Sequence, residues 1–73
     1  MFTVTLLCDP TTPCLDPAMG RSLCNAWGGG AFTFLAMNVA AEFQVAEAPG
    51  NFWQVWEEMQ GLGVDLAIQP TEG

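Results

Sequence analysis

The stretch from Ala31 to Ala46, AFTFLAMNVAAEFQVA, decides the fold because it contains two alternating segments joined by a short break. In residues 31–36 two phenylalanines alternate with Thr and Leu, and in residues 41–46 Phe and Val alternate with Glu and Gln. Alternation with a period of two is typical of strands that bury one face. The sequence therefore predicts a β-hairpin with its turn near residues 37–38.

Upstream of this hairpin, the sequence predicts a strand and then a helix. Residues Phe2 to Cys8 alternate and are rich in β-branched and aromatic side chains, which favours a strand. Asp16 is a favoured N-cap, and Pro17 suits the first helical position because its missing N–H is not needed there. Gly28 can adopt the left-handed conformation that ends helices. The expected apolar stripe of this helix is Met19, Leu23, Ala26 and Trp27.

Downstream of the hairpin, the sequence predicts a helix and then a last strand. Asn51 is a good N-cap, and Gln54 three residues later completes a capping-box pattern. Gly61 or Gly63 is expected to end the helix. Residues 64–69 alternate as a last strand, which a proline ends. The expected apolar stripe of this helix is Phe52, Val55, Trp56 and Met59.

The predicted order of elements is therefore β-α-β-β-α-β. Two β-α-β halves joined by a hairpin form the ferredoxin-like α+β arrangement, a two-layer sandwich in which two helices cover one face of a four-stranded antiparallel sheet. The other face of the sheet has no predicted element to cover it. We expect one domain over residues 1–70, with residues 71–73 as a tail or the start of a linker.

The charge of the chain is strongly one-sided and excludes several classes of partner. Eight Asp and Glu residues face a single basic residue, Arg21, which gives a net charge of -7. Proteins that bind nucleic acid need Lys and Arg to neutralise phosphates, and anionic membrane surfaces make the same demand. We therefore expect no nucleic-acid partner and no membrane partner, and an unfavourable field for phosphorylated substrates.

The cysteines and the absence of histidine bear on metals and on the cellular compartment. Cys8, Cys14 and Cys24 are an odd number at irregular spacing, so the sequence implies no disulfide framework. Cys8 and Cys24 are expected to act as small buried hydrophobes. Without His or a C-x-x-C pair, no metal site is predicted. The opening residues lack a basic region, so no signal peptide is predicted, and a cytoplasmic location with free thiols is expected.

Several blocks along the whole chain are similar to one protein family. They are MFTVTLL (1–7), LCNAWGGG (23–30), AAEF (40–43), NFW (51–53) and VDLAIQPTEG (64–73). Together they resemble the N-terminal ACT-like segment of bacterial phosphoserine phosphatases of the alphaproteobacterial type. The run Asn-Ala-Trp-Gly-Gly-Gly and the Val-Asp-Leu to Gln-Pro ending carry most of the specificity of this resemblance.

The resemblance implies an accessory role in L-serine biosynthesis. In that family a segment like this one precedes a magnesium-dependent, haloacid-dehalogenase-type catalytic domain, which would begin beyond Gly73. The resemblance therefore implies regulation or oligomerisation, no catalysis by this chain and no cofactor in it, with magnesium only in the absent catalytic domain. The expected partners are a second copy of the chain or its own catalytic domain.

ACT domains similarly hold an amino acid at the loop between the first strand and the first helix. By that analogy the candidate ligand-binding residues are Asp9, Thr11, Thr12 and Asp16, and serine is one amino acid that they would bind. Ordinary turn and cap chemistry explains the same residues equally well. Trp53 lies off the apolar stripe of its helix, so it is either an interface anchor or a half-buried cover of the helix edge.

Two alternatives to a regulatory segment remain on sequence grounds. The first is a stand-alone ferredoxin-like interaction module that dimerises through its uncovered sheet face and binds no small molecule. The second is a small acidic enzyme, for which a chain without His, Lys or Tyr offers only carboxylate and thiol chemistry. Asp9 is not the nucleophile of an Asp-x-Asp-x-Thr phosphatase motif, because Thr11 stands where the second Asp is required.

Overall fold

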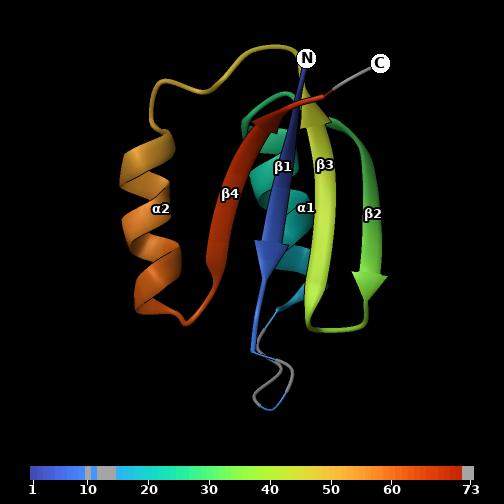
Figure 1. The fold of residues 1–73 in the computed structure, drawn as a ribbon, viewed down its shortest axis with the longest axis vertical. Coiled ribbons are helices and arrows are strands. Elements are labelled where there is room, and N and C mark those ends of the chain that lie inside the picture. The colour runs from blue at the N-terminus through green and yellow to red at the C-terminus, as the bar shows by residue number, and fades with distance from the viewer. Residues whose placement is uncertain (10, 12–14, 72–73) are drawn as a thin grey trace.

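The computed structural model describes residues 1–9, 11 and 15–71 and has the predicted order of elements (Figure 1). The elements are β1 (Phe2–Leu7), α1 (Pro17–Ala26), β2 (Gly30–Ala36), β3 (Ala40–Val45), α2 (Phe52–Gly61) and β4 (Asp65–Pro70). The four strands form one antiparallel sheet in the order β2-β3-β1-β4. This is the ferredoxin-like α+β arrangement that the sequence predicts.

The backbone pairing of the central strand β1 fixes which groups of its neighbours point outward. The N–H of Cys8 donates to the carbonyl of Val39 at 2.6 Å, and the N–H of Thr71 donates to the carbonyl of Met1 at 3.0 Å. Antiparallel residues alternate between hydrogen-bonded and non-hydrogen-bonded pairs. In the observed register, even-numbered residues of β1 therefore bond to β3 and odd-numbered residues bond to β4. On β4, the backbone groups of Leu66 and Ile68 consequently point away from the sheet.

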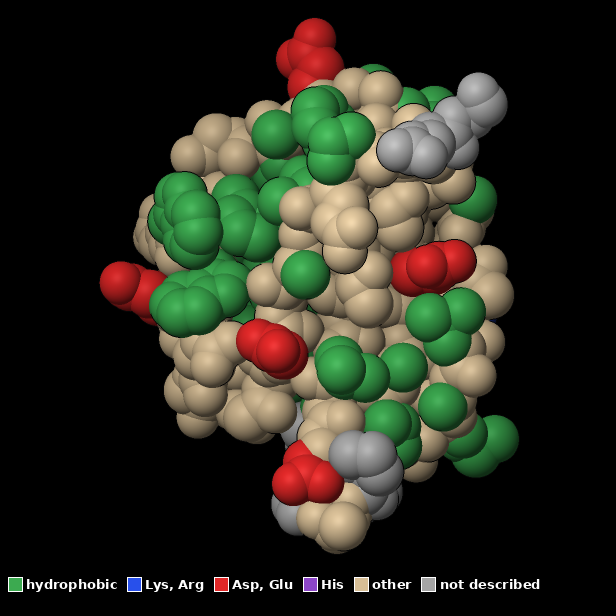
Figure 2. Space-filling model, viewed as in Figure 1, with side chains coloured by type: hydrophobic (Ala, Val, Ile, Leu, Met, Phe, Trp, Pro, Cys, Tyr) green, Lys and Arg blue, Asp and Glu red, His purple; other side chains and the backbone are tan. Residues whose placement is uncertain are grey.

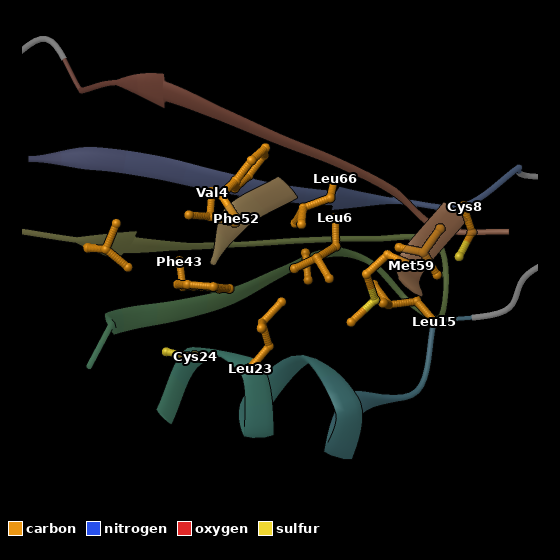
Figure 3. Packing of buried hydrophobic residues seen from close by; sticks show 13 residues of the cluster. Val4, Leu6, Cys8, Leu15, Leu23, Cys24, Phe43, Phe52, Met59 and Leu66 are labelled. Atoms are coloured by element: carbon orange, nitrogen blue, oxygen red, sulfur yellow. The ribbon is translucent and has the colours of Figure 1, made fainter. Parts of the chain in front are cut away.

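Both helices bury side chains against the same face of the sheet (Figure 3). The sheet contributes Val4, Leu6, Phe43, Val45 and Leu66, α1 contributes Leu23 and Cys24, and α2 contributes Phe52 and Met59. Phe43 is 0% exposed, and its ring lies 6.2 Å from that of Trp27 and 6.4 Å from that of Phe32. These rings join the end of α1 to β2 and β3.

The caps of α1 agree with the sequence, and so does most of its expected apolar stripe. The carboxylate of Asp16 accepts from the N–H of Ala18 at 2.9 Å, and Gly28 has a φ of 65°. Leu23 and Cys24 are buried as expected, Met19 and Trp27 pack half-buried against the core, and only Ala26 of the expected stripe is exposed. The ring of Phe32 packs so closely against the helix that a Cβ on Gly20 would lie 3.0 Å from it. Gly20 therefore permits this helix to approach β2.

The N-terminus of α2 differs from the capping box that the sequence predicts. The side chain of Asn51 makes no hydrogen bond to the helix, and its Oδ1 instead accepts from the indole N–H of Trp27 at 2.9 Å. A half-buried Trp needs an acceptor for this group, and Asn51 provides one from the neighbouring helix. Along α2, Phe52 and Met59 are buried, while Val55 and Trp56 are only half-buried. Val55 and Trp56 still pack against the core, so the whole expected stripe faces it.

Pro70 belongs to β4, although the sequence suggested that it ends the strand. At this even-numbered position the backbone nitrogen points away from β1, so the missing N–H removes no ladder bond. The outer face of the sheet, seen in Figure 2, is largely polar. Leu7 and Leu35 are exposed apolar residues on its strands, 46% and 55% accessible to solvent. In the part of the chain that the structure describes, no helix has the length and apolar character needed to cross a membrane.

Gly29 is the position where the structure leaves least room for a side chain. A Cβ there would lie 2.8 Å from Cδ2 of Phe43 and 2.9 Å from the carbonyl oxygen of Gln44, whereas a Cβ on Gly30 meets nothing within 4 Å. We expect Gly29→Ala to lower the free energy of unfolding by about 1–3 kcal/mol through overpacking. Urea denaturation followed by tryptophan fluorescence measures this loss. Gly30→Ala is the matched control, and equal effects of the two substitutions would contradict the packing shown here.

Candidate functional site

The loop after β1 holds two of the candidate ligand-binding residues, and they bond to each other. Oδ1 of Asp9 accepts from the backbone N–H of Thr11 at 2.9 Å and from its hydroxyl at 2.8 Å. The backbone N–H first, and then the hydroxyl, hold the pKa of Asp9 below its ordinary value. This arrangement is an Asx turn, so Oδ1 of Asp9 and both donors of Thr11 are already used in local bonds.

Asp16, the third described candidate, caps α1 and does not join Asp9 in a described pocket. Its Oδ1 is occupied by the N–H of Ala18. The preceding Leu15 is buried, and its N–H donates to the carbonyl of Asn38 at 3.0 Å, which ties the loop to the β2–β3 turn. Thr12, the remaining candidate, lies outside the described residues. The turn and cap interpretation therefore accounts for every described residue of this set.

A groove lies between α2 and β4. It has a volume of about 580 Å³ and combines residues of the β3–α2 loop, of α2 and of β4. Its lining consists of Ala48, Pro49, Gly50, Phe52, Trp53, Trp56, Leu66, Ala67 and Ile68. Figure 1 shows α2 alongside β4 at the border of the sheet. All of these side chains are apolar, so the groove is suited to an apolar or aromatic group.

Trp53 forms the exposed wall of this groove. Its side chain is 71% exposed, and its ring meets those of Phe52 at 5.3 Å and Trp56 at 5.8 Å, both edge to face. Two neighbouring rings therefore hold Trp53 in place while most of its surface stays exposed. The sequence singles out this residue as either an interface anchor or a cover of the helix edge. At the end of α2, the amide of Gln60 donates to the carboxylate of Asp65 at 2.9 Å.

A second hollow of about 370 Å³ lies where α1 begins and the β2–β3 hairpin turns. Its lining is Pro17, Phe34, Leu35, Ala36, Met37 and Asn38. Met37 is 84% exposed at the tip of the turn, and Asn38 has a φ of 58°, which this type of residue tolerates well. The β2–β3 hairpin thus has an exposed apolar tip. This tip lies at the far end of β2 from the connection with α1.

The cysteines offer no reactive thiol among the described residues. Cys24 is buried, and burial raises the pKa of its thiol more than the nearby Arg21 lowers it, so the thiolate is disfavoured. Cys8 is also buried and is disulfide-bonded, which corrects the expectation of free thiols for this residue. The spacing of cysteines along the sequence could not show this, because a disulfide forms only between cysteines that the fold brings close together. No group of three His, Cys, Asp or Glu side chains within the described ranges is arranged to hold a metal.

Comparison with known proteins adds no identification. Neither the protein-family models, nor the curated proteins, nor the solved structures that were searched match this chain. The class that the fold defines is therefore a small α+β domain of the ferredoxin-like type, and its function must be argued from its own surface.

Sequence reasoning found Trp53 but missed the groove beside it. The helical stripe placed Trp56 on the core side, and the structure packs it half-buried against the core, where it also lines the groove. The one available signal was the excess of large apolar residues in a chain of 73 residues, more than a small core can bury. That excess indicated an exposed apolar surface without placing it.

The bonds of Asp9 make its titration a test of the Asx turn. Thr11→Val removes the hydroxyl donor and keeps the backbone N–H, so the pKa of Asp9 should rise part of the way toward its ordinary value. Because the folded pKa is lowered, the contribution of Asp9 to stability is present above the unfolded pKa and is lost as the pH falls through the folded one. Carboxyl-detected NMR titration measures the shift. Thr33→Val is the control, and an unchanged Asp9 in Thr11→Val would contradict the turn.

Proposed function

We propose that this chain is a non-catalytic accessory domain that regulates or assembles a phosphoserine phosphatase. Its sequence blocks resemble the N-terminal segment of that family along most of the chain. The observation that supports a binding role most directly is the exposed apolar groove between α2 and β4, because large aromatic surface on a small acidic domain is typical of interaction sites.

Assembly is the better supported half of this proposal. The carboxylates of Asp9 and Asp16 each use an oxygen in local bonds, which leaves less of either group for the ammonium of an amino acid. Trp53, by contrast, presents most of its ring to solvent. The domain therefore acts chiefly by contact with another protein surface, and amino-acid binding is the secondary role.

Magnesium enters the proposal only through a catalytic domain beyond Gly73. The described carboxylates form no cluster that fits the ion. A cytoplasmic location follows from the role in serine biosynthesis. Reading the encoding gene past the Gly73 codon tests the assignment: a strand running into Asp-x-Asp-x-Thr supports it, and a stop codon overturns it.

The regulatory half predicts a localised response to L-serine. If the loop before α1 binds the amino acid, backbone amide signals of Thr11 and Asp16 should shift in a saturable way during an NMR titration. D-serine at the same concentrations is the matched control for non-specific effects. Absence of any shift at high millimolar L-serine would remove the amino-acid role and leave the assembly role standing.

The alternative is a stand-alone interaction module that dimerises and binds no small molecule. The exposed Leu7 and Leu35 on the open face, together with Met37 at the hairpin tip, favour it. It predicts a dimer in equilibrium sedimentation at high micromolar concentration and physiological salt. Leu35→Ser should weaken that dimer at least tenfold, whereas Thr33→Ser on the same strand should not. A monomer under these conditions would count against self-association.

A further inference from the structure

The outer edge of β4 is a second feature of the groove, besides its aromatic wall. β4 is the last strand of the sheet and pairs only with β1 among the described residues. The alternation set by the bond from Thr71 to Met1 directs the N–H and carbonyl groups of Leu66 and Ile68 outward. The same two residues line the groove. Backbone donors and acceptors therefore stand along one wall of an apolar hollow.

The opposite wall is α2, which lies beside this edge without closing it. Phe52 is buried and forms the floor, while Trp53 and Trp56 rise from the helix. Figure 2 shows their neighbourhood as a group of apolar side chains over α2 with acidic side chains next to it. A strand edge facing a helix across an apolar groove is a geometry that extended peptides occupy by strand addition, because main-chain bonds give affinity and the groove accepts alternate side chains.

Charge decides what kind of peptide fits. The chain has a net charge of -7, and its one basic residue, Arg21, lies on α1 and is not among the residues that line the groove. Glu47 directly precedes the lining residue Ala48, Glu57 follows Trp56, and Asp65 precedes Leu66. A second copy of this acidic chain would bring like charges together at these positions, whereas a basic segment would be attracted. Arg and Lys side chains also bind favourably over Trp rings.

We propose that the α2–β4 groove binds an extended, basic peptide segment that adds as a strand to the free edge of β4. Its backbone bonds to Leu66 and Ile68, and one of its apolar side chains enters the hollow below Trp53 and Trp56. Its Arg or Lys side chains lie over Trp53 and near the bordering carboxylates. This binding site does not depend on the phosphatase assignment, since it follows from the edge, the groove and the charge.

The test uses the whole chain and a six-residue peptide of alternating arginine and valine, with a glutamate and valine peptide as the matched control. We expect saturable binding of the basic peptide with amide shifts at Leu66 and Ile68, and at least tenfold weaker binding at 1 M salt, where charges are screened beyond about 3 Å. Trp53→Ala should weaken binding at least tenfold, and Met37→Ala, which removes an even more exposed apolar side chain elsewhere, should leave it unchanged.

A peptide modification tests strand addition without altering the protein. N-methylation at alternate residues removes the N–H groups of one edge of the peptide, so one methylation phase should abolish binding and the other should preserve it. Equal effects of the two phases would overturn the strand model. The proposal also fails if the acidic peptide binds as tightly, if no binding occurs at millimolar peptide, or if concentration-dependent shifts show that a second copy occupies the edge.

Discussion

The burial of Phe43 is the constraint on which the rest of this fold depends. Its ring is closed in by Trp27 and Phe32, and the backbone at Gly29 passes so near that a methyl group would collide with it. Trp27 in turn lies 6.0 Å from Phe52 and donates to Asn51, so the end of α1 and the beginning of α2 are positioned by the same cluster. In a domain this small, one well-packed ring contributes a large part of the core.

The small size of the core also explains why a groove remains. Phe52 and Met59 of α2 are buried in the core, whereas Val55 and Trp56 between them are only half-buried against it. With a short sheet and ten-residue helices, the core cannot accept every large side chain that the sequence supplies. Part of the surplus, Trp53 and the half-buried Trp56, lies between α2 and β4, where the backbone groups of Leu66 and Ile68 also point outward. Natural proteins commonly protect such edges, and here Pro70 protects only the end of the strand.

Much of the architecture followed from the sequence because strand alternation and helix-ending residues are local signals. Asp16, Pro17 and Gly28 act within one turn of chain, and each has the role expected of it. The misassigned positions depend on contacts between elements. Ala26 is exposed although its spacing placed it on the apolar stripe, and the side chain of Asn51 bonds to Trp27 and not to its own helix. The candidate sites follow the same rule. The local bonds of Asp9 and Asp16 were predictable from the sequence, whereas the groove is formed by three segments that meet only in the folded chain.

Arg21 gives this domain an unusual relation to proteolysis. It is the one basic residue in 73, so trypsin, which cuts after Lys and Arg, has a single place to act. That place is inside α1, where the guanidinium carbon lies 5.1 Å from the ring centroid of Phe32. A protease needs an opened segment, so the rate at which trypsin cleaves the native protein measures the opening of α1. When α1 recloses faster than trypsin cuts, this rate is proportional to the population of the open form. Trypsin cleavage of this chain therefore reports on the local opening of α1.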